Sequence, residues 1–291
     1  MIPQVFEYFV PKTLSEAFSL LTKYGEDAKI LAGGHSLIPL MKLRLAAPPY
    51  LIDINQIPDL DYLKEENGFL KIGALTREVS LEESDLIAEK FPIILDTAKV
   101  IADPLVRNMA TVGGNLAHGD PANDHPATML ALGAQVVLTG PSGSRTVSVK
   151  EFFVDLMMTQ LQPDEILTEI QIPLPPANSG GAYVKFERKV GDFAIVGVAA
   201  QVALDANGAC QKVGIGLTNV GSVPIEAEKA EDALRGKQID EQTLKEAGRL
   251  AADASDPTDD LRGTANYKRS LVNVLTKRAL KQALTRAKGG N

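Results

Sequence analysis

Two histidines and two aspartates lie close together in GGNLAHGDPANDHP, residues 113–126. Imidazole and carboxylate groups are ligands that a non-haem metal accepts, so these four side chains form a candidate metal set: His118, Asp120, Asp124 and His125. The prolines and glycine between them stiffen the segment, and the spacing is not that of the HExxH helix, where two histidines lie four residues apart. From the residues alone, three interpretations stay open: a metal site, a ligand-binding loop and a solvated turn.

Two paired-glycine segments could bring the backbone close to a ligand. The first, AGGHS at 32–36, follows a strand-like KILA and precedes an amphipathic segment, which predicts a strand-loop-helix arrangement. The helix start would add unpaired N–H groups suited to a pyrophosphate. The second, TVGGN at 111–115, flanks its glycines with hydroxyl and amide side chains. Together they indicate one elongated ligand held twice, and plain turns are the alternative.

The elements that must position these segments fall into three blocks and predict an α+β protein. Residues 1–57 contain a helix capped by Thr13 and ended by Gly25, then the first glycine segment between two strands. Residues 58–174 contain strands at 69–74, 134–140, 145–149 and 165–173, with helical periodicity from about 86 to 100. After a linker-like stretch at 174–181, residues 178–291 predict a three-stranded antiparallel sheet followed by helices.

Composition excludes several function classes. The formal charge of −7 argues against nucleic acid as the main partner, because phosphate binding needs clustered Lys and Arg. Cys210 is the only cysteine, so this chain cannot supply the thiolates of an iron–sulfur cluster. No apolar run approaches the roughly 20 residues of a membrane span, and the first residues lack the features of a signal peptide. We therefore expect no membrane span and a cytoplasmic location.

Four motifs, in order along the chain, resemble the FAD-binding medium subunits of the molybdenum hydroxylases, the family of xanthine dehydrogenase and carbon monoxide dehydrogenase. They are AGGHS, IADPLVRNMATVGGNLAHGDPANDHP, QPDEILTEIQIP and AYVKFERKVGDFAIVGVAA. The similarity covers essentially the whole chain and is strongest to the carbon monoxide dehydrogenase branch. It implies two α/β FAD-binding subdomains with a PCMH/vanillyl-alcohol-oxidase-like flavin fold, followed by the C-terminal sheet and helices.

The resemblance implies FAD bound non-covalently between the first two units. The first segment would contact it through Leu31, Ala32, Gly33, Gly34, His35, Ser36 and Leu37, and the second through Thr111, Val112, Gly113, Gly114 and Asn115. Five further positions match the family, with core packing as the alternative for the apolar ones: Ile101 and Leu167 near the rings, Asp124 as a hydrogen-bonding acid, and Lys185 and Asp192 near the flavin. Phe193 matches an aromatic position near the isoalloxazine face. The family's usual His and Gln are replaced by Asp103 and Leu105, so no role is carried to those two.

The implied function is electron transfer, with no catalytic acid, base or metal ligand in this chain. A large subunit would hold the molybdenum cofactor and a small subunit two [2Fe–2S] clusters, in a dimer of heterotrimers that passes electrons through FAD to an external acceptor. The alternatives are a stand-alone flavin oxidase of the same fold, a non-catalytic adaptor and a His/Asp metal-binding protein. The substrate of the complex stays open among carbon monoxide, aldehydes, purines and other N-heterocycles, and so does the acceptor.

Overall fold

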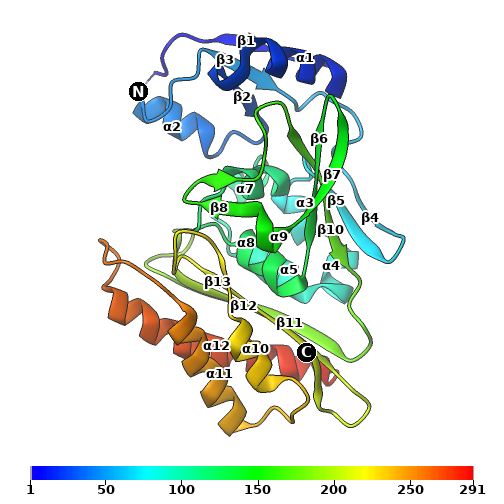
Figure 1. The fold of residues 1–291 in the computed structure, drawn as a ribbon, viewed down its shortest axis with the longest axis vertical. Helices are drawn as coiled ribbons and strands as arrows, with labels where there is room; N and C mark the ends of the chain where they lie inside the picture. The colour runs from blue at the N-terminus through cyan, green and yellow to red at the C-terminus, as the bar shows by residue number, and fades with distance from the viewer. Residues whose placement is uncertain (1, 291) are drawn as a thin grey trace.

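The computed structural model describes residues 2–290, and its main sheets follow one another along the long axis of the molecule (Figure 1). We call the three parts the N-terminal, middle and C-terminal tiers. Each has an apolar core of its own. The boundaries expected from the sequence stay a prediction, and the outermost residues of the first and third units, Met1 and Asn291, lie outside the described residues.

The N-terminal tier is a three-stranded parallel sheet in the order β1-β3-β2. Its elements are β1 (Glu7–Phe9), α1 (Leu14–Tyr24), η1 (Gly25–Asp27), β2 (Ala28–Leu31), α2 (Leu37–Leu43) and β3 (Tyr50–Asp53). The Thr13 hydroxyl accepts a hydrogen bond from the Glu16 N–H at 3.2 Å, and Gly25 ends the helix at φ 54°. The expected cap and stop are therefore present, while β1 was not anticipated.

The middle tier is a five-stranded antiparallel sheet in the order β4-β5-β10-β6-β7, with short helices against it. Its strands are β4 (Leu63–Glu66), β5 (Phe69–Gly73), β6 (Gln135–Gly140), β7 (Gly143–Ser148) and β10 (Ile166–Pro173), with a separate hairpin of β8 (Phe153–Asp155) and β9 (Met158–Thr159). Its helices are α3 (Glu78–Glu82), α4 (Asp85–Lys90), α5 (Pro92–Lys99), α6 (Pro104–Arg107), α7 (Val112–His118), α8 (His125–Leu132) and α9 (Val149–Phe152).

Two features of this tier differ from the sequence expectation. The single helical stretch from about 86 to 100 is two helices, because Pro92 lacks the N–H that would continue the first one and instead starts α5. The TVGGN segment is the start of α7 instead of a loop. Thr111 caps this helix by accepting a hydrogen bond from the Gly114 N–H at 3.2 Å.

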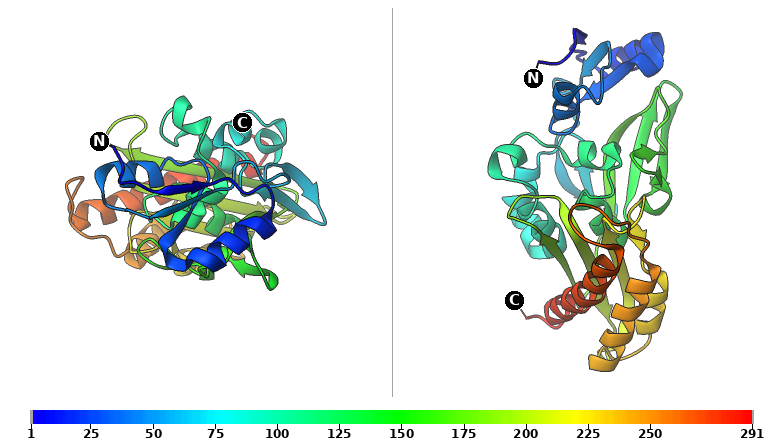
Figure 2. Two further views of the ribbon diagram at one scale, coloured as in Figure 1. Left: turned by 90° about the horizontal axis from the view of Figure 1, so that it is seen from above. Right: turned by 90° about the vertical axis from the view of Figure 1, so that its left-hand side faces the viewer.

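The C-terminal tier is an antiparallel sheet in the order β11-β12-β13-β14. The three expected strands, β11 (Ser179–Glu187), β12 (Ala194–Leu204) and β13 (Cys210–Thr218), are joined by a two-residue strand β14 (Ile225–Glu226). The first strand starts inside the segment expected to be a linker. Helices α10 (Glu228–Leu234), α11 (Glu241–Ala254) and α12 (Ala265–Ala287) form a layer at the end of the molecule opposite the N-terminal tier (Figure 2).

Helix α8, together with α5, joins the middle tier to the C-terminal sheet. All eight of its residues are buried. A Cβ atom on Gly214 would stand 2.1 Å from the Ala131 carbonyl oxygen, and one on Gly216 would stand 2.0 Å from that of Ala127. The sheet therefore lies on this helix at a distance that only glycine permits, with α12 on its other face.

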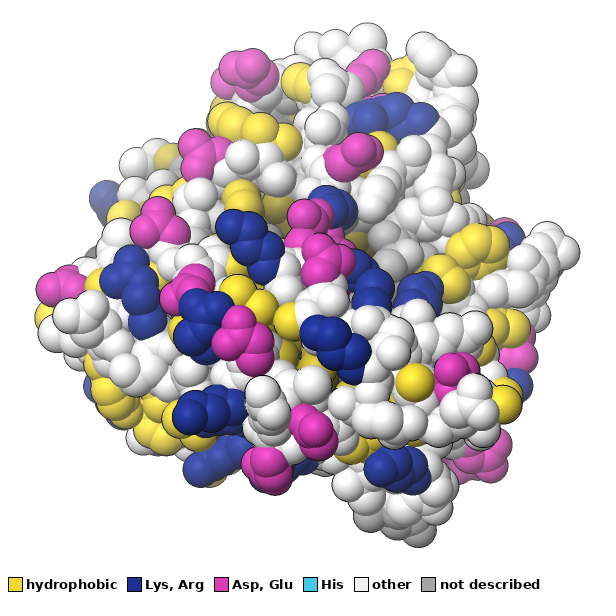
Figure 3. All heavy atoms as spheres, turned by 60° about the horizontal axis from the view of Figure 1, so that its bottom comes forward, with side chains coloured by type: hydrophobic (Ala, Val, Ile, Leu, Met, Phe, Trp, Pro, Cys, Tyr) yellow, Lys and Arg dark blue, Asp and Glu magenta, His cyan; other side chains and the backbone are white. Residues whose placement is uncertain are grey.

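The face seen from the C-terminal end carries Lys and Arg side chains interspersed with Asp and Glu (Figure 3). Arg249 of α11, for example, pairs with Glu246 and Asp253. Charge of one sign does not gather on this face. Across residues 2–290, no helix has both the length and the apolar character that crossing a bilayer requires.

Candidate functional site

A cavity of about 970 Å³ lies between the tiers and takes lining residues from all three. Of the residues expected at the cofactor site, all but Val112, Gly113 and Leu167 line it. Val112 is fully buried, and a Cβ atom on Gly113 would stand 2.6 Å from the Ala74 carbonyl oxygen, so both face the core. Leu167 belongs to the apolar core of the middle tier. These three positions pack into the core of the middle tier, and their role at the cofactor site stays a prediction.

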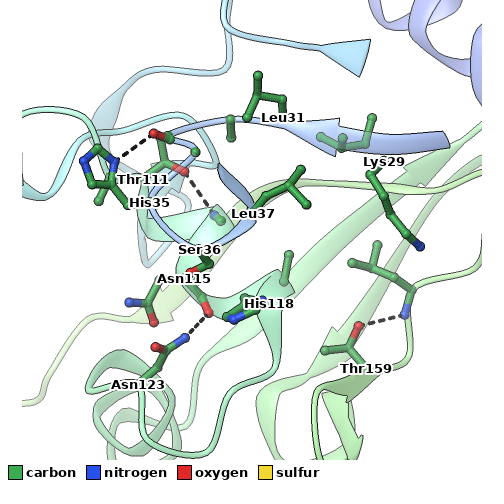
Figure 4. Close-up of a pocket in the computed structure, with 18 of the residues that line it drawn as sticks. Lys29, Leu31, His35, Ser36, Leu37, Thr111, Asn115, His118, Asn123 and Thr159 are labelled. Atoms are coloured by element: carbon green, nitrogen blue, oxygen red, sulfur yellow. Dashed lines mark hydrogen bonds between the residues drawn. The ribbon is translucent and has the colours of Figure 1, made fainter. Parts of the chain in front are cut away.

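The first wall is the segment between β2 and α2. Leu31 and Leu37 lie at its two ends, with His35 between them (Figure 4). Gly34 adopts φ 77°, a left-handed conformation that glycine takes without steric cost. The His35 Nδ1 lies 2.9 Å from the Gly33 carbonyl oxygen, so the imidazole is held against its own loop.

This wall touches the second one through Gly33. A Cβ atom there would stand 2.5 Å from the Met109 carbonyl oxygen and 3.0 Å from the Thr111 nitrogen. The two glycine segments, 78 positions apart between Gly33 and Thr111, are therefore in backbone contact. The structure thus places the two glycine segments side by side, whereas the sequence showed only that they are similar in composition.

The second wall is the start of α7. The Asn115 side chain lines the cavity, and its Oδ1 atom is buried without a hydrogen-bond partner among the described residues. Its backbone carbonyl accepts from the Asn123 Nδ2 at 2.8 Å (Figure 4). His118 lies on the same wall, where burial lowers the pKa of its imidazole and the Asp120 carboxylate opposes that shift.

The third wall is a buried polar network reaching in from β11. The Asp124 Oδ2 accepts from the Lys185 Nζ at 2.9 Å, and the Oδ1 accepts from the Tyr183 hydroxyl at 2.6 Å. The Lys185 ammonium also donates to the Val100 carbonyl at 3.0 Å. Burial raises the pKa of Asp124, and Lys185 is the strongest influence in the opposite direction. This network places one cation at the cavity wall with its counter-ion beside it.

The turn between β11 and β12 closes the same side. Asp192 and Phe193 line the cavity, and the Asp192 Oδ1 accepts from the Arg262 Nη2 at 2.9 Å. The Arg262 guanidinium lowers the pKa of this carboxyl. Arg262 sits in a loop that is itself fixed to α12, because the buried Lys268 donates to the Asp260 Oδ2 at 2.7 Å. Phe193 stays half exposed.

Sequence reasoning missed several residues of this site. Tyr183 read only as a strand residue, and Arg262 lies in a segment with no motif at all. Others line the cavity although the resemblance gave them no role: Lys29, His118, Asn123, Met158 and Thr159, of which His118 had been considered only as a metal ligand. An available signal was the pair Tyr183 and Lys185, which share one face of β11 because side chains alternate along a strand.

Three of the four side chains of the candidate metal set bind different partners, and the fourth, His118, lies on the cavity wall. Asp124 pairs with Lys185, while the buried His125 Nε2 lies 2.6 Å from the Glu78 Oε2. The Asp120 Oδ1 accepts from the Ala122 N–H at 2.9 Å. Within residues 2–290, no three His, Cys, Asp or Glu side chains gather as metal ligands would.

Comparison with known proteins shows the family. Residues 4–175 match the FAD binding domain in molybdopterin dehydrogenase, and residues 181–283 match the CO dehydrogenase flavoprotein C-terminal domain. The chain therefore belongs to the family of FAD-binding medium subunits of molybdenum hydroxylases. These are flavoprotein subunits of oxidoreductases.

Individual relatives agree along the whole chain. The chain is 46% identical to the carbon monoxide dehydrogenase medium chain of Afipia carboxidovorans, over 99% of this chain and 100% of the relative. It is 36% identical to the 6-hydroxypseudooxynicotine dehydrogenase complex subunit alpha of Paenarthrobacter nicotinovorans, over 99% and 97%. A carbon monoxide dehydrogenase structure from Hydrogenophaga pseudoflava, lacking the Mo-pyranopterin moiety, matches with a TM-score of 0.96 and 46% identity, over 98% and 99%.

Proposed function

We propose that the chain binds FAD non-covalently in this cavity and serves as the electron-transfer subunit of a molybdenum hydroxylase. The observation that carries the proposal is the contact of the two glycine segments at Gly33, which builds one continuous backbone wall from two distant parts of the chain. Such a wall suits an elongated ligand with a pyrophosphate at its middle, because glycines let phosphate oxygens approach backbone N–H groups closely.

The residues present fit that cofactor. The Asn115 Oδ1 atom is buried at the cavity and has no hydrogen-bond partner within residues 2–290, and a hydroxyl of a bound sugar chain would satisfy it there. At Gly114, a Cβ atom would stand 2.6 Å from the Thr111 hydroxyl that caps α7. A larger residue there would disturb both the cap and the wall. The cavity volume lies within the range of small-molecule sites.

Each wall has a distinct task in this proposal. The segments 32–36 and 111–115 hold the pyrophosphate and the adjoining sugar. Asp124 and Lys185 form the polar side of the flavin pocket, and Phe193 covers it from the third tier. Ile101, 8% exposed, gives an apolar contact from the middle tier.

FAD, when bound, supplies redox chemistry that amino-acid side chains cannot. The protein contributes position, electrostatics and exclusion of water. Lys185 brings a positive charge to the cavity wall, which favours additional negative charge inside the cavity. No side chain of this chain is assigned as a general acid or base.

The proposal includes the partners that the family implies. A large subunit would carry the molybdenum cofactor and a small subunit two [2Fe–2S] clusters, in a dimer of heterotrimers that delivers electrons through this chain to an external acceptor. A cytoplasmic location belongs to the same proposal. The substrate stays with the large subunit, since relatives with this fold carry names as different as carbon monoxide dehydrogenase and 6-hydroxypseudooxynicotine dehydrogenase.

The test is purification of the chain co-expressed with its neighbouring genes, followed by an absorbance spectrum and a count of subunits and metals. Acid-released flavin, iron–sulfur absorption and molybdenum from two co-purifying chains support the proposal. A lone chain with flavin and substrate turnover of its own would favour the stand-alone oxidase. A folded chain that neither contains nor takes up FAD would contradict the cofactor assignment.

A further inference from the structure

Tyr183 is a buried residue behind the cavity wall, and it lies within the AYVKFERK motif, where the sequence analysis assigned it no role. Its hydroxyl donates to the Asp124 Oδ1 at 2.6 Å, while the Asp124 Oδ2 accepts from Lys185 at 2.9 Å. Asp124 and Lys185 line the cavity, and Tyr183 does not. Each carboxylate oxygen therefore has one donor from β11, and only one of the two donors can touch a ligand.

The backbone of β11 explains why both donors reach the same carboxylate. Tyr183 and Lys185 are two positions apart, so they point to one face of the strand. Asp124 immediately precedes α8, which packs on that sheet. Each donor reaches one oxygen of the carboxyl group, so the strand holds the aspartate through both of its oxygens.

Gly197 on the neighbouring strand makes room for the phenol. A Cβ atom at this position would stand 2.2 Å from the Tyr183 hydroxyl oxygen and 2.8 Å from the Cζ atom. Any other residue at position 197 would displace the tyrosine from its bond to Asp124. The Thr218 hydroxyl, 3.2 Å from that of Tyr183, holds the phenol from the next strand.

We propose that Tyr183 is a positioning residue of the cofactor site, whose hydroxyl fixes the Asp124 carboxylate so that Lys185 stays at the cavity wall. This inference rests on the proposed FAD site and names a residue that acts on it without touching the ligand. It also assigns Gly197 the task of leaving the space that the phenol needs.

The electrostatics give this role a signature that packing alone would lack. Burial raises the pKa of Asp124, and three neighbours oppose the shift: Lys185 most, then the Tyr183 hydroxyl and His125. Two acids complete the surroundings, since Glu187 lies 3.4 Å from the Lys185 Nζ and Glu78 of α3 pairs with His125. Removing the phenol hydroxyl removes a donor to the charged form, so the pKa of Asp124 rises further.

The test compares Tyr183→Phe with Tyr62→Phe in the full chain loaded with FAD. Tyr62 is the matched control, because it donates to the Glu169 carboxylate at 2.5 Å and Glu169, unlike Asp124, does not line the cavity. FAD release is followed by its fluorescence as the pH is lowered. We expect the midpoint of release to move to higher pH by about one unit in Tyr183→Phe, the worth of a hydrogen bond to a charged acceptor. Tyr62→Phe should keep the wild-type midpoint.

Three outcomes are decisive. An unchanged midpoint in a folded Tyr183→Phe protein overturns the inference and leaves the FAD site standing. A wild-type chain that takes up no FAD at any pH overturns the proposed function, and the inference with it. If Tyr183→Phe does not fold, Thr218→Val replaces it, since it removes only the second contact of the phenol. A smaller shift in the same direction then supports the role, and no shift overturns it.

Discussion

A Cβ atom on Gly191 would stand 2.8 Å from the carbonyl oxygen of Ala102. Gly191 belongs to the turn between β11 and β12, and Ala102 follows α5, so the C-terminal and middle tiers meet here backbone to backbone. Both residues line the cavity, and both adopt positive φ, 82° and 46°. The turn that carries Phe193 thus packs on the middle tier at Gly191, and the Arg262 side chain holds it through Asp192.

Arg262→Met should loosen that turn. The variant loses the bond to the Asp192 Oδ1 at 2.9 Å, which is the contact from the 255–264 loop to the turn. We expect hydrogen exchange of the amides at 189–193 to become several-fold faster by mass spectrometry, and FAD to dissociate faster. Arg249→Met is the control, because Arg249 has similar ion pairs on α11 away from the cavity. Equal exchange in the two variants would contradict the role of Arg262.

Gly33→Ala should separate the two glycine segments. The new methyl group would stand 2.5 Å from the Met109 carbonyl oxygen, so one backbone has to move. We expect FAD affinity, measured by titration of the apoprotein, to fall at least about tenfold, because displacement at a positioned site readily costs that factor. Gly68→Ala is the control: it costs about 1 kcal/mol of backbone strain at φ 82°, has open space around it, and should leave affinity unchanged.

Lys185→Met should lower the midpoint potential of the bound flavin. Reduction adds negative charge, and the variant removes a cation from the cavity wall while leaving the Asp124 carboxylate behind. We expect a decrease on the order of tens of millivolts. Lys189→Met removes an exposed lysine four residues away and should change the potential little. The same potential in wild type and Lys185→Met would show that this charge does not influence the flavin.

Glu231 should make the protein less stable as the pH rises from about 5 to 8. Burial raises the pKa of Glu231 from 4.5 to about 7. Its contribution is therefore complete below the unfolded pKa and is lost as the pH rises through the folded pKa. The loss is at most about 3 kcal/mol.

The check is the melting temperature of Glu231→Gln at both pH values. The amide oxygen can still accept from the Ile215 N–H, which the carboxylate binds at 2.9 Å, so the fold is retained. We expect the melting temperature of Glu231→Gln to fall less between the lower and the higher pH than that of the wild type. Glu228→Gln is the control, because the Glu228 carboxyl is exposed and Lys150 lowers its pKa. Its melting temperature should fall between the two pH values as much as that of the wild type.

Local chemistry made parts of the fold predictable. Thr13 and Gly25 bound α1 because a cap and a left-handed stop act within one turn of the chain. Asn207 and Gly208 mark the tight connection between β12 and β13 for the same reason, with φ 78° at the glycine. Strand β1 was missed because its three residues are mostly exposed and show no alternation.

The sequence predicted many of the residues that line the candidate site, but not the contacts between them. Paired glycines suggested a loop at 111–115, yet α7 starts there, because Thr111 caps the helix and tertiary context outweighs the low helix propensity of glycine. The hydrogen bond between Tyr183 and Asp124 joins residues 59 positions apart, and the sequence around either residue does not predict that the two are in contact. Contacts of this kind depend on how the tiers stack, which no local pattern encodes.

Helix α8 has a consequence for how the chain folds and for how it can be divided. Its eight residues are covered by the C-terminal sheet on one side and by the middle tier on the other, so the helix is fully buried only when both parts are present. A fragment cut at the connection near residue 176 would present this apolar helix to water, an invitation to aggregate. The two matched regions, 4–175 and 181–283, should therefore unfold in one cooperative transition. During synthesis, we expect the first region to complete its packing only after the second has been made.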